Sequence, residues 1–233
     1  MQHFQTPSYT CSYLNGKEAK AEVICADRKL DAKVYTELVE SGFRRSGKLS
    51  YRPNCEFCNE CVPIRLNVHD FKPNKTQRKT FKKLSKILVP SYEKLAFFEE
   101  HFALYKKYQV IRHPSKIAVE HTRSNYIKFV LESNVESEFI AFRNSDGKLI
   151  MMSIFDVLID GISSVYTFYD PECVRESLGT YGILWQIEEC RIRNKNFLYL
   201  GYWIKENKKM SYKNKFKPYQ ILVREEWRTN YEL

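Results

Sequence analysis

The sequence lacks long hydrophobic segments. No run of about eighteen apolar residues, the length that a membrane-spanning helix needs, occurs in the chain. Residues 1–20 also lack a basic start followed by an apolar run, which is the pattern of a secretion signal. We therefore expect a protein that is neither secreted nor inserted in a membrane, and that works in the cytoplasm.

Histidine is scarce, and cysteine is unevenly placed. The 5 histidines show no spacing that would provide a nucleophile with its base, so hydrolase chemistry is not favoured. The 7 cysteines, an odd number, fit a reducing compartment better than a disulfide framework. Cys55, Cys58 and Cys61 have the spacing that lets thiolates converge on a metal ion or an iron–sulfur cluster, with Cys11 as a fourth ligand. The alternative is a set of small buried residues in a tight loop.

Internal repeats and low-complexity linkers are also absent, and the composition is that of a globular protein. Of the residues, 43% are hydrophobic and 28% charged, enough to build a core. The net charge is +10, and it is concentrated. No carboxylate interrupts residues 72–86, and Glu206 alone opposes the lysines of 205–217. Two separate basic segments suit an extended phosphate backbone.

The first half of the chain mixes helical and strand patterns. Hydrophobic periodicity predicts helices over 32–41, 74–88, 92–111 and 120–131, and strict alternation predicts a strand over 62–68. Residues 42–61 show no clear period and read as a structured loop or short strands. The helix over 74–88 is amphipathic, because Phe81, Leu84 and Leu88 form one stripe and basic residues cover the rest.

The second half begins with a period of two. It predicts an antiparallel meander over 138–169, a glycine-containing loop over 177–182, a helix over 183–193, and strands over 197–204 and 219–228. This is the order of the acyltransferase fold related to the N-acetyltransferases, in which a glycine loop presents backbone N–H groups to phosphate. The alternative is that Gly179 and Gly182 are turn and packing glycines.

We therefore predict an α+β fold with two closely joined lobes. Residues 1–70 would form a smaller lobe that contains the cysteine cluster. Residues 71–233 would form an acyltransferase lobe of the N-acetyltransferase (GNAT) type, with a basic helical segment at about 74–131. The length agrees with either one large core or two small ones, since single cores stop growing only at roughly 250–300 residues.

Two polar patterns point to ligands. Arg44 and Arg45 lie side by side in Gly42-Phe-Arg-Arg-Ser-Gly47, where their forked donors can hold a carboxylate or a phosphate. A solvated loop is the rival interpretation. Tyrosine is abundant, with 16 in the chain, and rings near lysines can stack on unpaired bases of a nucleic acid. For any one tyrosine, core packing is the simpler explanation.

Eight motifs follow one another over nearly the whole chain. They are Cys11-Ser-Tyr13-Leu14, Gly42-Phe-Arg-Arg-Ser-Gly47, Tyr51-Arg-Pro-Asn-Cys55-x-x-Cys58-x-x-Cys61-Val-Pro-Ile-Arg65, Phe71-x-Pro73-Asn-Lys-Thr-Gln77-Arg78, Ser164-Val-Tyr-Thr-Phe-Tyr-Asp-Pro171, Ser177-Leu-Gly-Thr-Tyr181, Leu200-Gly-Tyr-Trp-Ile204 and Lys209-Met-Ser-Tyr-Lys213. In this combination the chain closely resembles the bacterial aspartate/glutamate leucyltransferases, relatives of the eukaryotic arginyl-tRNA–protein transferases.

The resemblance implies an activity and its partners. The family transfers leucine from leucyl-tRNA to proteins whose N-terminal residue is Asp or Glu, which creates a destabilising N-terminus for degradation. It implies no required cofactor, and a monomer or weak dimer. Leu14 follows Tyr13 where the eukaryotic relatives have paired cysteines, so a bound cluster is not implied. The alternatives are a non-catalytic tRNA- or RNA-binding module and an acetyl-CoA-dependent N-acetyltransferase, which its sparse glycine loop and large basic segments disfavour.

The resemblance also suggests site residues. We expect Arg44, Arg45 and Arg65 to hold the acceptor's carboxylate, because a planar guanidinium matches it bidentately. Further substrate-contacting residues expected from the matching motifs are Ser46, Tyr51, Gln77, Tyr166, Gly179 and Tyr202. The tRNA phosphates are expected to contact Lys75, Arg78, Lys79, Lys82, Lys83, Lys208, Lys209 and Lys213.

The chemistry needs little from the protein. An aminoacyl ester is already activated, so the enzyme aligns the acceptor's amine, removes a proton and stabilises an oxyanion. Asp170, at the end of the predicted meander, is the candidate base, with Tyr169 and Tyr181 as hydrogen-bonding partners. An Asp before Pro is also a common turn residue. In that case the proton passes to the 3′-oxygen of the tRNA and Asp170 positions other groups.

Overall fold

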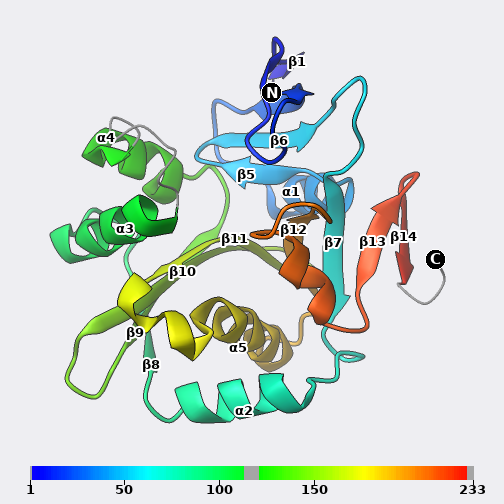
Figure 1. Ribbon diagram of the computed structural model, residues 1–233. Helices are drawn as coiled ribbons and strands as arrows, with labels where there is room; N and C mark the ends of the chain where they lie inside the picture. Colours follow the sequence, from blue (N-terminus) through cyan, green and yellow to red (C-terminus); the bar gives the residue numbers. More distant parts are fainter. Residues whose placement is uncertain (1, 113–120, 230–233) are drawn as a thin grey trace.

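An eight-stranded mixed sheet forms the centre of the molecule (Figure 1). The computed structural model describes residues 2–112 and 121–229. The strand order is β14-β13-β7-β12-β11-β10-β9-β8. The strands are β7 (Val62–Asn67), β8 (Val89–Glu93), β9 (Ser137–Arg143), β10 (Leu149–Val157), β11 (Gly161–Tyr169), β12 (Phe197–Trp203), β13 (Gln220–Val223) and β14 (Glu226–Thr229). The mixed α+β class predicted from the sequence is confirmed.

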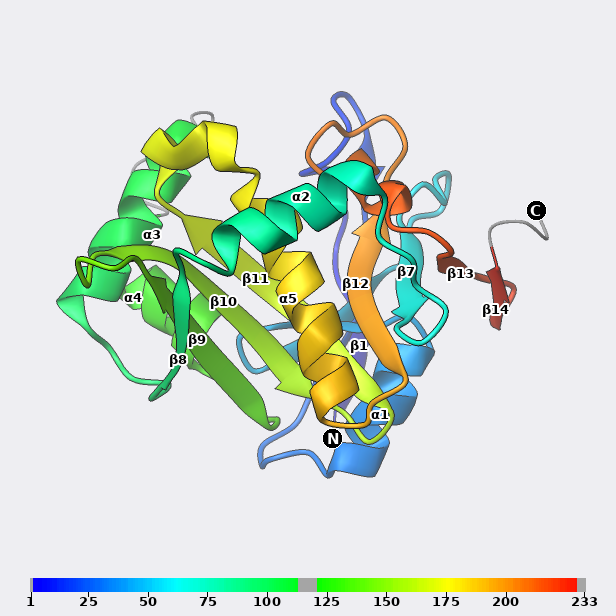
Figure 2. The ribbon, with the colours of Figure 1, turned by 90° about the horizontal axis from the view of Figure 1, so that it is seen from below.

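Helices cover both faces of this sheet. On one face lies α5 (Leu178–Ile192), with α2 (Lys75–Leu84) packed across it (Figure 2). On the other lie α3 (Glu99–Arg112), α4 (Arg123–Tyr126) and the π-helix η2 (Ile127–Leu131). Alternate residues of the strands therefore enter two separate cores: Met151 packs with Ile187 on one side, and Met152 packs with Tyr126 on the other. None of the helices in the described ranges has the length and apolar character that a membrane crossing requires.

A second, smaller sheet stands against the first. Its order is β1-β4-β6-β5, built from β1 (Gln2–Gln5), β4 (Ala21–Cys25), β5 (Arg44–Ser46) and β6 (Leu49–Pro53). The short hairpin of β2 (Tyr9–Thr10) and β3 (Glu18–Ala19) and the helix α1 (Ala32–Glu40) accompany it. Strand β7, which the sequence analysis assigned to the N-terminal lobe, lies between β12 and β13 of the large sheet.

Helix α2 shows why its sequence is helical. Asn74 caps the first turn and Gln77 returns the hydrogen bond to the backbone of Asn74, which forms a capping box. Leu84 is buried, and Phe81 packs against the ring of Tyr181 on α5. The basic residues therefore point away from the protein. The helix ends at Leu84, one turn before the predicted end.

Two predicted boundaries differ from the structure. The helix expected over 92–111 begins at Glu99, because Val89–Glu93 pairs with β9 and forms an edge strand instead. The loop expected over 177–182 is already helical, since α5 begins at Leu178. Gly182 lies inside this helix, where its Cα faces Thr167 and Met151 of the sheet.

The C-terminal strand expected over 219–228 is a hairpin of two strands. Arg224 and Glu225, between β13 and β14, have φ values of 50° and 67°. Two successive residues with positive φ are the signature of the tight turn that joins antiparallel strands. The glycine or asparagine usual in such turns is missing here, so this turn has no local signal in the sequence.

Candidate active site

Strands β11 and β12 are parallel neighbours that separate along their length. Their pairing ends at Ser163 and Tyr199, and beyond that point the strands diverge above α5 (Figure 2). Both are irregular here: the register of β11 against β10 shifts beside Val165, and that of β12 against β7 shifts between Tyr199 and Tyr202. Such bulges bend strands and redirect side chains. We call the space between Ser164 on β11 and Gly201 on β12 the β11–β12 opening.

Arg44 of the small sheet fills part of this opening. Its Nη2 atom donates a hydrogen bond to the carbonyl oxygen of Ser164. Its guanidinium lies against Gly201, where a Cβ would stand 2.7 Å from the Arg44 Cζ atom. Gly201 also has a φ of 77°, so both its backbone and its neighbour require glycine. The Nη1 atom of Arg44 is buried and has no hydrogen-bond partner among the described residues.

Lys213 reaches the same place from the turn η4 (Ser211–Lys215). The side chain is buried, and its Nζ donates a hydrogen bond of 2.7 Å to the carbonyl oxygen of Tyr202. Burial, with the nearby charge of Arg44, lowers the pKa of Lys213 to about 7. In the described part of the chain no carboxylate forms an ion pair with Arg44 or Lys213. The expectation that Lys213 binds tRNA phosphate is therefore corrected: the flanking core residues draw this lysine inside.

Tyrosines form the wall beneath the small sheet. The hydroxyl of Tyr202 donates towards the carbonyl oxygens of Gly42 at 2.9 Å and Tyr51 at 3.2 Å. The rings of Tyr51 and Tyr202 are 6.3 Å apart. Tyr51 and burial raise the pKa of Tyr13, and burial raises that of Tyr202, so both are neutral hydroxyls. Tyr51 and Tyr202, both expected site residues, thus do lie beside the opening.

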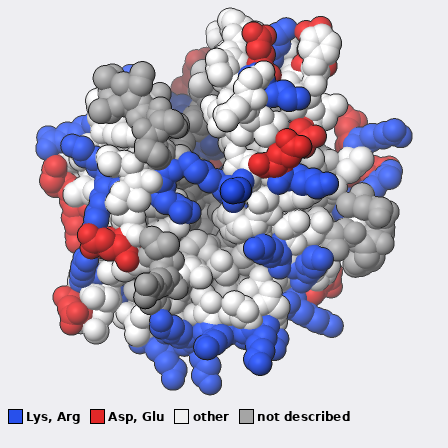
Figure 3. Space-filling model, in the orientation of Figure 1, with Lys and Arg blue, Asp and Glu red and all other residues white. Residues whose placement is uncertain are grey.

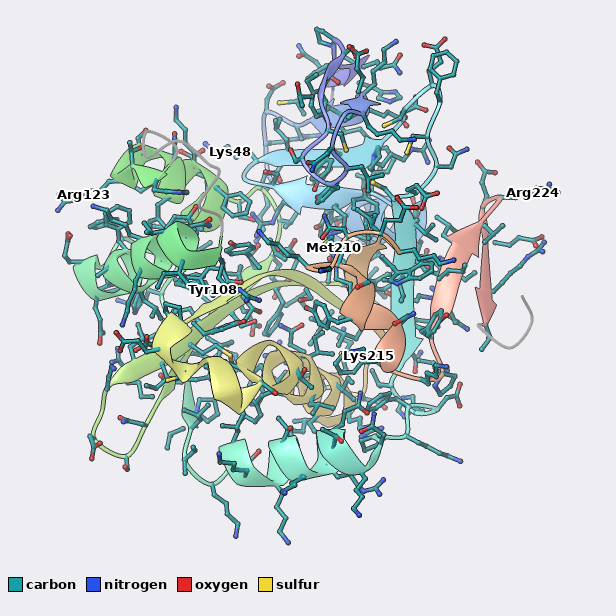
Figure 4. All side chains as sticks on the ribbon, in the orientation of Figure 1. Lys48, Tyr108, Arg123, Met210, Lys215 and Arg224 are labelled. Atoms are coloured by element: carbon teal, nitrogen blue, oxygen red, sulfur yellow. The ribbon has the colours of Figure 1, made fainter. Side chains whose placement is uncertain are left out.

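A second group of rings comes from α3 and β11. Tyr108 lies 5.0 Å from Tyr169 and 6.3 Å from Tyr166, measured between ring centroids. Tyr166 accepts a hydrogen bond of 2.8 Å from Gln109. Burial raises the pKa of Tyr108 to about 12. Figure 4 shows Tyr108 to the left of Met210, which lies near the centre of the molecule and 3.7 Å from the Lys213 Nζ.

Arg45 and Arg65 face other parts of the protein than Arg44. The side chain of Arg45 is fully buried and its Nε lies 2.9 Å from the Asp156 carboxylate. The guanidinium of Arg65 lies over the rings of Phe197 and Trp227, at 3.8 and 4.4 Å. Ser46 follows on β5 and pairs with Leu49. Of the three arginines expected to hold the acceptor, the structure brings Arg44 alone to the opening.

Asp170 lies at the end of β11, as the sequence suggests, but it is held by lysines. Its two carboxylate oxygens are each 2.9 Å from an amine, one from Lys107 and one from Lys148. Burial alone would raise the pKa of Asp170, yet the hydrogen bonds from Lys107 and Lys148 outweigh it and lower the pKa to about 2. A carboxyl group with so low a pKa accepts a proton poorly at neutral pH. The contacts favour the positioning role for Asp170 over that of the base.

Three other expected site residues have structural contacts. Tyr181 is 1% exposed and packs between Phe81 and Phe142. Gln77 caps α2 and donates to the carbonyl of Lys215 at 3.2 Å, which ties α2 to η4. Gly179 lies in the first turn of α5, near Tyr169.

The basic face of α2 is the largest concentration of positive charge in view. Blue side chains line the lower edge of the molecule in Figure 3, where Figure 1 places α2. The exposed basic residues of the helix are Lys75, Arg78, Lys79, Lys82 and Lys83. Lys208 and Lys209 are exposed as well, and the Nζ of Lys209 donates to the carbonyl of Arg112 at 2.5 Å.

The cysteine cluster lies beside the small sheet. Burial, together with the neighbouring Cys11, Cys55 and Cys58, raises the pKa of Cys61 to about 12. The four thiols therefore gather in space. Over residues 2–112 and 121–229, however, no group of three or more Cys, His, Asp or Glu side chains is arranged to hold a metal ion.

Two family models match consecutive parts of the chain. Residues 9–79 match the model described as arginine-tRNA-protein transferase, N terminus, and residues 100–223 match the model of its C terminus. Together these two matches cover most of the chain and define its class, that of the tRNA-dependent protein transferases.

Sequence similarity to known proteins identifies the subfamily within this class. The chain is 46% identical to the aspartate/glutamate leucyltransferase of Methylobacillus flagellatus, covering 98% of this chain and 91% of the relative. It is 44% identical to the aspartate/glutamate leucyltransferase of Chromobacterium violaceum, covering 97% and 93%. The chain thus belongs to the arginine-tRNA-protein transferase family, among the aspartate/glutamate leucyltransferases.

Solved structures are more distant. L-PGS from Bacillus licheniformis has a TM-score of 0.48 at 9% identity, over 65% of this chain and 48% of that chain. FemX has a TM-score of 0.46 at 7% identity, over 76% and 61%.

Proposed function

We propose that the chain transfers leucine from leucyl-tRNA to the N-terminus of proteins that begin with Asp or Glu, and so marks them for degradation. The observation that carries this proposal is the similarity to leucyltransferases over 98% of the chain. The reaction takes place in the cytoplasm, where charged tRNA is used, and joins the leucyl carbonyl to the acceptor's α-amine.

The reaction is assigned to the β11–β12 opening. Parallel strands that separate, with α5 directly after the meander, support an acyltransferase lobe of the GNAT type, with the smaller cysteine-containing lobe beside it. Arg44 projects from that lobe into the opening. The acceptor thus lies where the two lobes meet.

Arg44 holds the carboxylate of the acceptor's first side chain. Its buried Nη1 has no partner among the described residues, so a carboxylate that enters the opening supplies one. No carboxylate of the described chain pairs with Arg44, so its charge is not already compensated. A guanidinium without a paired carboxylate favours an anionic side chain and rejects its amide.

Lys213 accepts the proton of the acceptor's amine. Its hydrogen bond to the Tyr202 carbonyl is made by one N–H, and in the neutral form the lone pair of Nζ remains available. With a pKa near 7, Lys213 is neutral in a large share of molecules at neutral pH and can take a proton, and the acceptor reacts as its free α-amine, whose ammonium form has a usual pKa of about 7.7–8. The amine nitrogen bonds to the ester carbonyl carbon, Lys213 takes one of its two N–H protons, the bond to the 3′-oxygen breaks, and Lys213 gives that proton to the leaving oxygen.

The tRNA lies along α2, with its acceptor end at the opening. The exposed lysines and arginine of α2 contact phosphates, as do Lys208 and Lys209 beside η4. Tyr108, Tyr166 and Tyr169 provide ring faces and edges for the unpaired 3′ end.

The proposal is tested with purified protein, leucyl-tRNA or arginyl-tRNA, and peptides that begin with Asp or Asn. Transfer of leucine to the Asp peptide, with little transfer of arginine or to the Asn peptide, is the expected result. A chain that binds leucyl-tRNA without transfer is a binding module. Acetylation of the same peptides by acetyl-CoA would instead identify an N-acetyltransferase.

A further inference from the structure

A buried ion pair lies directly behind Arg44. Arg45 Nε donates to both oxygens of Asp156, at 3.0 and 2.9 Å, and both side chains are completely inaccessible. Tyr35 and Ser137 donate to the same carboxylate, each at 2.6 Å. We call these four residues the Asp156 cluster. Three donors surround one carboxylate, so its charge is well compensated.

The cluster ties four separate segments together. Tyr35 belongs to α1, Ser137 to β9 and Asp156 to β10, while Arg45 belongs to β5. Arg45 Nη1 also donates to the carbonyls of Gly47 and Glu132, both at 3.1 Å. Arg45 therefore fixes the small sheet against the large one.

Strand β5 needs such an anchor. It has three residues, lies at the edge of the small sheet, and pairs with β6 through Arg44, Arg45 and Ser46. A ladder this short holds a strand weakly. Successive side chains of a strand point to opposite faces, so Arg45 enters the cluster while Arg44 reaches Ser164 and Gly201. Any shift of β5 would move Arg44.

We propose that the Asp156 cluster is a positioning device that sets the place and direction of the Arg44 guanidinium, and through it the enzyme's preference for an acidic acceptor residue. The inference rests on the proposed role of Arg44. A buried ion pair contributes little net stability against apolar residues of the same size, so stability alone does not account for it. Holding the Arg44 guanidinium in one direction does account for the buried ion pair, because a bidentate contact depends on that direction.

Two conservative variants test the cluster while keeping the ion pair. Tyr35→Phe and Ser137→Ala each remove one hydrogen bond to Asp156. Tyr199→Phe is the matched control, because Tyr199 is 2% exposed and its hydroxyl, which donates to Asp160 at 2.7 Å and accepts from Arg65 at 3.1 Å, makes no hydrogen bond to the Asp156 cluster. KM and kcat are measured with Asp- and Asn-initiated peptides and saturating leucyl-tRNA. We expect the two cluster variants to raise KM for the Asp peptide about three- to tenfold, less than the ten- to hundredfold cost of losing a charge-assisted contact outright, because Arg44 is displaced and not removed.

The effect must also depend on Arg44. In an Arg44→Ala background, Tyr35→Phe should leave KM unchanged, since the group it positions is gone. The inference is overturned if Tyr35→Phe has no more effect than Tyr199→Phe, or if it raises KM equally in both backgrounds. An Arg44→Ala protein with wild-type preference for Asp over Asn would remove the proposed role of Arg44, and this inference with it. Leucine transfer itself would stand, since the same assay measures it.

Discussion

The chain uses its lysines in two opposite ways. Those of α2 cover the outer face of an amphipathic helix, whereas Lys213 lies inside, beside Arg44 and against the Tyr202 carbonyl. Both come from basic segments of similar sequence. In α2 the lysines stay charged and exposed, where they attract phosphate; Lys213, buried, has a pKa near 7 and can exchange a proton. In the proposed function, this difference in environment separates the lysines that bind tRNA from the lysine that takes part in the reaction.

The largest expected effect comes from removing the buried amine. Lys213→Gln should lower the rate of transfer from bound leucyl-tRNA about 10²- to 10⁴-fold, the usual contribution of a general base. Lys215→Gln, an exposed lysine of the same turn (Figure 4), should have little effect. In the wild-type protein the rate should rise with pH through about 7, because Lys213 must lose its proton before it accepts another. A Lys213→Gln protein with the wild-type rate would exclude the base role.

Replacing the exposed lysines of α2 should change the affinity for leucyl-tRNA and its salt dependence. Lys75, Lys79 and Lys82 lie along one stripe of α2, and replacing all three by Gln should reduce the slope of log affinity against log salt by about 2 to 3, since each phosphate contact contributes about 0.7–0.9. Binding of leucyl-tRNA is measured over a range of salt concentrations. An unchanged slope would mean that α2 is merely a solvated helix.

Arg44 differs from both groups, because its half-buried side chain lies beside Lys213 but is proposed to serve binding. Arg44→Lys keeps the charge and loses the fork, so selectivity for Asp over Asn peptides should fall about ten- to a hundredfold, from a lost contact of about 1.5–3 kcal/mol. Arg52→Lys, on β6, is the control. Competition between the two peptides in one reaction measures the ratio. If the selectivity for Asp over Asn peptides is unchanged, Arg44 does not hold the acceptor's side chain.

Asp170 should affect stability more than rate. Its folded pKa of about 2 lies below the ordinary 3.8, so its stabilising contribution is complete above about 3.8 and is lost as pH falls through 2. Lys107 and Lys148 are 38% and 58% exposed, so solvent weakens the pairs, and Asp170→Asn should cost about 1 kcal/mol at pH 7. Unfolding by urea at pH 7 measures the change in stability, and single-turnover transfer measures the change in rate. A transfer rate reduced a hundredfold or more would restore Asp170 as the base.

The sequence predicts this molecule best where signals are local. The meander, α1, α2 and β12 follow from periodicity, and the arginine pair and the basic helix were recognised from composition and motif. The sequence does not show that Arg44 and Arg45 have different environments, because their partners Ser164 and Asp156 lie more than a hundred residues away in the chain. The burial of Lys213 is also hard to predict, and the one local sign of it in the sequence is the aromatic residues Tyr212 and Phe216 on either side.

The division between the two sets of lysines can be tested in one experiment. Affinity for leucyl-tRNA and the rate of transfer from the bound complex to an Asp peptide are measured for Lys213→Gln and for the triple variant of α2. We expect a crossed result: Lys213→Gln loses rate and keeps affinity, and the triple variant loses affinity and keeps rate. If both variants lose the same quantity, the two regions do not divide binding from chemistry.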